Sequence, residues 1–308
     1  MPSACFCLTY VLSLCLGLLC LLFVTFWSSH WRGGFSWDGS ALEFNWHPVL
    51  MVSGLLVLYG YAVVVYRLPF TWSQKKHIWK LVHAGLMLLA LVLSVLGLCA
   101  VFDFHRGIQA PHLYSLHSWV GICTVVLFAV QWVLGLGGFL LPCSPLWIRS
   151  SLKPVHSWMG KAILILSVTA CISGITEKLL FTLNGDSTEP YSSLPAEAKF
   201  VNSLGLLIVA FGLVTFGILS NKKWQRPEED AESVQVSMDA IAGTVLLLIS
   251  ADDRFCLFQY FNSLGVIVIT ASAQCTQPMR TLGARQGDVI VPQRAVSTQA
   301  FITDGWRL

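Results

Sequence analysis

Charged residues are scarce in this chain of 308 residues, where Asp, Glu, Lys and Arg together make up 11% and hydrophobic residues 55%. A soluble globular domain contains about 25% charged residues, so the composition excludes an ordinary soluble fold. The net charge is only +3, and the sequence has no run of Lys and Arg of the kind that follows a phosphate backbone. We therefore expect a multi-pass membrane protein, in contact with lipid, that has no nucleic-acid partner.

The sequence also lacks cysteine spacing typical of a metal site. None of its ten cysteines forms a CxxC pair, and most of them lie in or beside apolar segments. Cysteine in such a setting behaves as a small apolar packing residue. We assign the cysteines no chemistry.

No basic residue precedes the first apolar run, at 8–27, which is 20 residues long. A secretory signal has a basic start and an apolar core of about 7–15 residues. We therefore interpret this run as a first membrane-spanning helix.

Long apolar runs are what the sequence has in abundance. Each is close to the roughly 20 residues that a spanning helix needs. After the first run, they occupy residues 47–66, 81–102, 117–141, 156–180 and 200–220. The pattern predicts an all-α membrane domain, residues 1–226, with six transmembrane helices.

The basic residues orient these helices. Nine of them lie in the loops 67–80 and 142–155 and in the exit segment 221–226, whereas about four lie near the opposite helix ends. Cytosolic loops carry the excess of Lys and Arg. This asymmetry predicts that both termini lie in the cytosol.

Four histidines recur at intervals of 36, 34 and 39 residues, close to the starts of the second to fifth helices: His47, His83, His117 and His156. An ionisable side chain in a membrane helix is costly and usually faces the bundle interior or a functional site. The predicted topology puts His47 and His117 at the non-cytosolic end, and His83 and His156 at the cytosolic end. Since a helix of about 20 residues spans roughly 30 Å, the two pairs cannot share one ligand.

Two imidazoles on facing helices can ligate one haem iron from both sides. One haem for each pair would give a four-helix core, formed by the second to fifth helices, that carries electrons across the membrane. A closed zinc site is a weaker alternative because it needs about four ligands and each end offers two histidines. A transporter that uses the histidines to bind metal or protons without redox chemistry also remains an alternative.

Basic side chains stand beside the cytosolic pair. Lys76, Lys80 and His83 are spaced i, i+4 and i+7 and so share one helix face. With Arg67 and Arg149 they would form a cationic mouth for a small organic anion. The alternative is that these residues follow from topology alone and are solvated.

At the non-cytosolic end, Glu43, His105 and Glu197 lie near helix ends. Carboxylate and imidazole together suit a transition-metal ion or its chelate. Their wide separation in sequence leaves ordinary loop roles equally open.

Five segments of the chain resemble the cytochrome b561 family of transmembrane di-haem proteins, which use ascorbate as electron donor. The segments are 44–50 (FNWHPVL), 66–69 (YRLP), 80–84 (KLVHA), 113–119 (LYSLHSW) and 152–156 (LKPVH). The resemblance covers about residues 8–226 and is greatest for the lysosomal branch of the family. It implies a late endosomal or lysosomal membrane, with the plasma membrane as the alternative.

The resemblance also implies roles for individual residues. His47 and His117 would hold the non-cytosolic haem b, and His83 and His156 the cytosolic one. Cytosolic ascorbate would be bound by Arg67, Lys76, Lys80 and Arg149, and the non-cytosolic metal by His105 and Glu197. The implied activity is ferric reduction by a homodimer, with monodehydroascorbate or cupric ion as alternative acceptors.

The resemblance does not extend to residues 227–308. The apolar stretch 240–250 in this tail is about 11 residues long, which is too short to span a membrane. We expect a poorly ordered cytosolic extension, and we hypothesise that it arises from an alternative transcript or gene-model end.

Overall fold

The computed structural model describes residues 4–141, 144–185 and 189–227. The predicted tail, apart from Pro227, lies outside these residues. Six helical spans in the described part are long and apolar enough to cross a membrane. They are Ala4–His30, Ala41–Arg67, Lys76–Gly107, Leu116–Leu140, Leu146–Asn184 and Ala196–Ser220. The prediction of an all-α fold with six transmembrane helices is confirmed.

Four of the spans consist mainly or entirely of one long helix: α1 (Ala4–His30), α5 (Lys76–Gly107), α7 (Leu146–Asn184) and α8 (Ala196–Ser220). The fourth span joins α6 (Leu116–Gly135) to a π-helical segment, η4 (Leu136–Leu140). Proline precedes α7 and α8 at Pro145 and Pro195. Proline is tolerated there because the first N–H groups of a helix have no partner within the helix.

The second span is divided into shorter pieces. It comprises α2 (Ala41–Phe44), α3 (Trp46–Met51), the π-helical η1 (Val52–Leu58), α4 (Tyr59–Val64) and a short 3₁₀ turn, η2 (Val65–Arg67). About 61% of its most apolar window is buried by protein, against 39% or less in the other spans. This span is therefore the centre of the bundle, and π-helical segments often mark functional positions.

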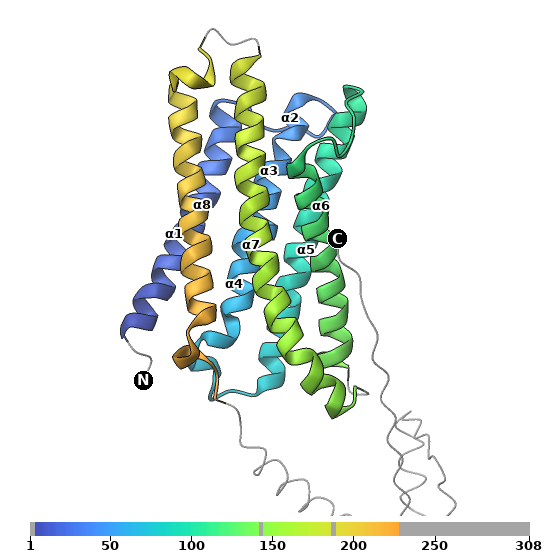
Figure 1. The fold of residues 1–308 in the computed structure, drawn as a ribbon, viewed down its shortest axis with the longest axis vertical. Coiled ribbons are helices and arrows are strands. Elements are labelled where there is room, and N and C mark those ends of the chain that lie inside the picture. The colour runs from blue at the N-terminus through green and yellow to red at the C-terminus, as the bar shows by residue number, and fades with distance from the viewer. Residues whose placement is uncertain (1–3, 142–143, 186–188, 228–308) are drawn as a thin grey trace, which may run out of the picture. The chain divides into compact units, whose positions relative to one another are not determined.

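The second to fifth spans pack in a closed ring. Helix α3 contacts α5, α5 contacts α6, α6 contacts α7, and α7 contacts both α3 and α4. Helices α1 and α8 pack against each other beside this ring, and Figure 1 shows them next to one another along the bundle. The predicted core of the second to fifth helices is thus the arrangement observed.

Two arginines connect segments at the end of the bundle that is predicted to face the cytosol. Arg67 donates hydrogen bonds to the carbonyls of Leu219 and Asn221, at the end of α8. Arg226 donates to three carbonyls of the loop before α5, those of Thr71, Trp72 and Gln74. The last carbonyls of a helix lack partners within the helix, so the Arg67 contacts stabilise the end of α8.

Candidate functional site: two histidine pairs in the bundle core

His47 and His117 form what we call the outer pair, at the end of the bundle predicted to be non-cytosolic. Their ring centroids lie 6.1 Å apart, and their planes are inclined by 82°. His47 Nδ1 lies 2.9 Å from the carbonyl oxygen of Gly97 on α5, and His117 Nδ1 lies 3.0 Å from that of Ala170 on α7. Because a carbonyl only accepts, each Nδ1–H donates and each Nε2 keeps its lone pair.

His83 and His156 form the inner pair, at the opposite end. Their ring centroids lie 6.4 Å apart, with planes inclined by 72°. His83 Nδ1 donates to the carbonyl oxygen of Ala62 at 2.8 Å. The backbone carbonyl of His156 accepts a hydrogen bond from Gln131 Nε2 at 2.6 Å. The two pairs therefore have similar geometry although they come from different helices.

The spacing within each pair fits a single metal ion between two imidazoles. Two metal–nitrogen bonds of about 2.0–2.1 Å separate the nitrogens by about 4 Å, and the two ring radii add about 2 Å. The resulting separation of about 6 Å agrees with the measured 6.1 and 6.4 Å. The residues therefore fit bis-histidine haem ligation.

A zinc site is not supported. Among residues 4–141, 144–185 and 189–227, no group of three or more His, Cys, Asp or Glu side chains could hold a metal ion. A closed zinc site needs about four such ligands. A metal held by either histidine pair would therefore have to bring further ligands of its own, as the iron of haem does.

Two glycines make room for the histidine rings. A Cβ atom on Gly174 would lie 2.6 Å from Cε1 of His117, and one on Gly135 would lie 3.0 Å from Cε1 of His156. A real Cβ does not approach a neighbouring carbon as closely as 2.6 Å. A larger residue at position 174 would therefore displace the ring of His117.

The two pairs lie at different depths in the bundle. On the second span, His47 is 15 residues from Ala62, the residue that binds His83; at 1.5 Å per residue this corresponds to about 22 Å. On α7, His156 is 14 residues from Ala170, the residue that binds His117, which corresponds to about 21 Å. The separations along the two helices agree, so the histidine pairs form two separate sites.

Aromatic side chains occupy the core between these sites. Tyr59 and Phe128 are almost completely buried, and their rings pack edge to face with centroids 4.9 Å apart. The Tyr59 hydroxyl donates to the carbonyl oxygen of Gly160 at 2.9 Å. These contacts join the second, fourth and fifth spans.

Three of the four predicted ascorbate residues gather beside the inner pair. Lys80 Nζ donates to the carbonyl oxygen of Phe139 at 3.2 Å, and Arg149 donates to that of Leu141 at 3.0 Å. Lys76 and Arg149 both interact electrostatically with Lys80. Arg67, the fourth, instead binds the end of α8.

The predicted outer metal residues take part in different contacts. Glu197 is buried, accepts a hydrogen bond from Trp27 Nε1 at 2.7 Å and forms an ion pair with Arg32. The ring of His105 stacks on that of His112, with centroids 5.6 Å apart and planes inclined by 21°. Glu197 is thus held by Trp27 in α1 and by Arg32 in the segment after α1.

Glu43, the remaining acidic residue proposed at this end, is almost fully buried. One of its carboxylate oxygens accepts a hydrogen bond from the backbone N–H of Gly39, and the other has no partner among the described residues. Glu43 therefore closes the loop that precedes the second span.

Sequence reasoning gave no role to two residues near the outer pair. Lys178 Nζ lies 4.0 Å from the centre of the Phe44 ring. Tyr114 donates a hydrogen bond to Glu177 at 3.0 Å. Partial burial and the Glu177 carboxylate raise the pKa of Tyr114 to about 12. The sequence shows Lys178 as a lysine one helical turn from Gly174. Its contact with Phe44, which is distant in sequence, could not be predicted.

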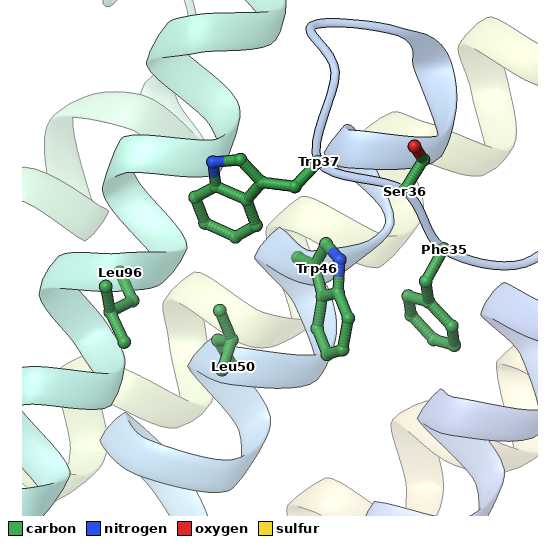
Figure 2. Close-up of a pocket in the computed structure, with 6 residues that line it drawn as sticks. All are labelled: Phe35, Ser36, Trp37, Trp46, Leu50 and Leu96. Atoms are coloured by element: carbon green, nitrogen blue, oxygen red, sulfur yellow. The ribbon is translucent and has the colours of Figure 1, made fainter.

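An apolar hollow of about 420 Å³ lies on the outside of the second and third spans. Figure 2 shows the residues that line it, which are Phe35, Ser36, Trp37, Trp46, Leu50 and Leu96. None of them is a predicted ligand or substrate residue. The lining of the hollow therefore includes no histidine of either pair.

Comparison with known proteins agrees with the geometry. Residues 46–182 match the family model described as eukaryotic cytochrome b561. The lysosomal membrane ascorbate-dependent ferrireductase of Danio rerio is 59% identical over 72% of this chain and 91% of its own length. The human protein of the same name is 55% identical over 74% of this chain and 94% of its own.

A plasma membrane ascorbate-dependent reductase of Xenopus laevis is 46% identical over 73% of this chain and 78% of its own length. Matches of this identity and coverage establish common descent over the membrane domain. The chain belongs to the eukaryotic cytochrome b561 family.

Proposed function

We propose that this chain is an ascorbate-dependent ferrireductase that carries single electrons across a membrane through two b-type haems. The outer pair, His47 and His117, would hold one haem, and the inner pair, His83 and His156, the other. The observation that carries the proposal is the presence of two imidazole pairs, each spaced for one iron, about 22 Å apart along the second span. Bound haem would supply one-electron redox chemistry.

The hydrogen bonds of the histidines prepare them for this role. His47, His83 and His117 each donate Nδ1–H to a backbone carbonyl of another helix. Such a bond sets the tautomer and the ring orientation and makes the other nitrogen a better ligand. The rings are thereby positioned by the fold, and a change of redox state does not require them to rotate.

The donor side is the cationic mouth beside the inner pair. Ascorbate is an anion at neutral pH, and Lys76, Lys80 and Arg149 place positive charge where it would approach His83. Lys80 lies three residues before His83 on α5, and thus on the same side of the helix. Ascorbate would release one electron and one proton there.

Arg67 supports the mouth indirectly. Its guanidinium holds the end of α8 beside the 3₁₀ turn η2. A guanidinium group has five N–H donors, so Arg67 still has donors that do not bind these carbonyls. We propose that these remaining donors contact ascorbate.

The acceptor side is the outer pair, where ferric iron would gain one electron and leave as ferrous iron. The relatives are named lysosomal membrane ferrireductases, and we propose the same membrane and the same acceptor for this chain. With the basic residues facing the cytosol, electrons would pass from cytosolic ascorbate to lumenal iron. A homodimer is also proposed, from family resemblance.

The absorption spectrum of the purified protein tests the haem assignment. We expect two bis-histidine b-type haems for each chain, one of which is lost in His83→Ala and the other in His117→Ala. His77→Ala is the matched control because His77 is exposed at the start of α5. Folded protein that binds no haem would refute the proposal and favour a non-redox transporter.

Proteoliposomes loaded with ascorbate test the direction of transfer and the acceptor. External ferric chelate should be reduced, and the rates with cupric ion and monodehydroascorbate rank the alternative acceptors. No reduction of any acceptor by haem-loaded protein would contradict the electron path.

A further inference from the structure

Lys178 is a cationic side chain in the outer half of α7 to which the proposed electron path gives no role. It follows Gly174 by one helical turn, so the two residues share a face of α7. Gly174 is the residue against which the ring of His117 packs. The backbone therefore places Lys178 at the outer edge of the His47–His117 site.

The contacts of the ammonium group locate it more closely. Lys178 Nζ lies 4.0 Å from the centre of the Phe44 ring, and this ring lies 5.9 Å from that of His47. Lys178 also interacts electrostatically with both His47 and His105. The positive charge thus lies at the rim of the outer pair, on the side where His105 stands.

Among the residues that the structure describes, no carboxylate forms an ion pair with this charge. The ion pairs among the described residues are Arg32 with Glu197 and Arg106 with Asp103, so Lys178 is in neither. Glu197 is near enough to interact with Lys178, but it is already bonded to Arg32 and Trp27. The neighbouring Glu177 accepts from Tyr114.

A partly buried ammonium group without an anion is unfavourable, and a cation–π contact offsets only a part of its desolvation cost. The group has three donors, and contact with a ring face satisfies none of them as a conventional hydrogen bond. An anion at this rim would neutralise Lys178 and accept from it. A carboxylate suits this role because its hydrogen bonds to an ammonium are charge-assisted.

We propose that Lys178 binds a carboxylate at the outer rim of the His47–His117 site. Two sources offer that group: a propionate of the outer haem, or a carboxylate of the ferric chelate that is reduced there. The inference rests on the proposed function and adds to it the residue that recognises the anion on the acceptor side.

The test uses the full chain with haem bound, as Lys178→Gln, Lys178→Arg and wild type. The control is Lys199→Gln, which removes an equal charge from an exposed position near the start of α8 at the same end. Three quantities are measured: haem content, the midpoint potentials of the haems, and KM and kcat for two acceptors. The acceptors are ferric citrate, which carries carboxylates, and hexaammineruthenium(III), which has none.

If the carboxylate is a haem propionate, Lys178→Gln should lower the potential of the outer haem, because loss of a positive charge favours the oxidised form. The two acceptors should then be affected alike. If it belongs to the chelate, KM for ferric citrate should rise about tenfold, as expected for loss of a charged hydrogen bond, whereas KM for the cationic ruthenium complex should not rise. In either case Lys178→Arg should restore the wild-type value.

Unchanged potentials and unchanged KM values in Lys178→Gln would overturn the inference, as would equal effects in Lys199→Gln. Loss of the outer haem in Lys178→Gln supports the propionate if Lys178→Arg retains that haem, and overturns the inference if both variants lose it. Wild-type protein that binds no haem, or that ascorbate does not reduce, would refute the proposed function itself.

Discussion

The two ends of the bundle treat charge differently. At the inner end, Lys80 and Arg149 donate to backbone carbonyls of the fourth span and its exit, and these carbonyls carry no net charge. Both salt bridges of the described residues lie at the outer end, where carboxylates neutralise Arg32 and Arg106. The basic residues of the inner mouth therefore keep their positive charge, as a site for an organic anion should. At the outer mouth, where Arg32 and Arg106 are neutralised, Lys178 is a basic residue that keeps its charge.

The largest expected effect comes from filling the space against a histidine ring. Gly174→Val should eliminate the outer haem alone, because its Cβ would lie 2.6 Å from Cε1 of His117. The inner haem should remain, which can be seen in the absorption spectrum. Gly217→Val on α8 is the control, since nothing lies within 4 Å of the Cβ position there. Loss of both haems would show that the two sites depend on one another.

The next effect separates a structural from a substrate role at the outer end. Glu197→Ala removes the partner of the mostly buried Arg32 and should lower the free energy of unfolding by about 3 kcal/mol. Thermal unfolding of the purified protein measures this. If Glu197 serves instead as a metal ligand for substrate, KM for ferric chelate will rise while the stability stays at the wild-type level.

A smaller effect tests the inner mouth. Lys80→Ala should slow reduction by ascorbate about tenfold, the loss expected for one charge-assisted hydrogen bond. Reduction by dithionite, which needs no such site, should be unchanged. Lys222→Ala, which removes a basic residue after α8 at the same end, is the control. Equal slowing with both reductants would mean that Lys80 supports the haem rather than ascorbate.

The smallest effect concerns Tyr114 at the outer end. Tyr114→Phe loses one partly exposed hydrogen bond to Glu177 and should cost less than about 1 kcal/mol. The raised pKa of about 12, against 10.0 ordinarily, means that this stability is complete below about pH 10 and is lost as the pH rises towards 12. Tyrosinate absorbance during a pH titration, compared with Tyr114→Phe, measures it. Ionisation of Tyr114 near pH 10 would contradict the expectation.

Local pattern was sufficient for the architecture. The length of the apolar runs predicted six spanning helices, and the spacing of four histidines predicted two pairs at two depths; the observed ring separations of 6.1 and 6.4 Å agree with such pairs. These features can be read because helix length and rise are properties of the chain itself. The family resemblance was confirmed by the comparisons. Haem ligation, the cytosolic termini and the homodimer stay predictions.

The partners of the charged side chains were decided by tertiary structure alone. Trp27 and Glu197 are 170 residues apart in sequence, and Arg67 and Asn221 are 154 residues apart. The two residues of each pair are nevertheless joined by a hydrogen bond. No periodicity relates residues so distant, so the contacts of Glu197 with Arg32 and Trp27 could not be predicted, and its role toward the substrate metal stays a prediction. Lys178 over Phe44 was missed for the same reason. The sequence by itself determined which side chains lie at each depth, and helix packing decided which of them keep a free charge.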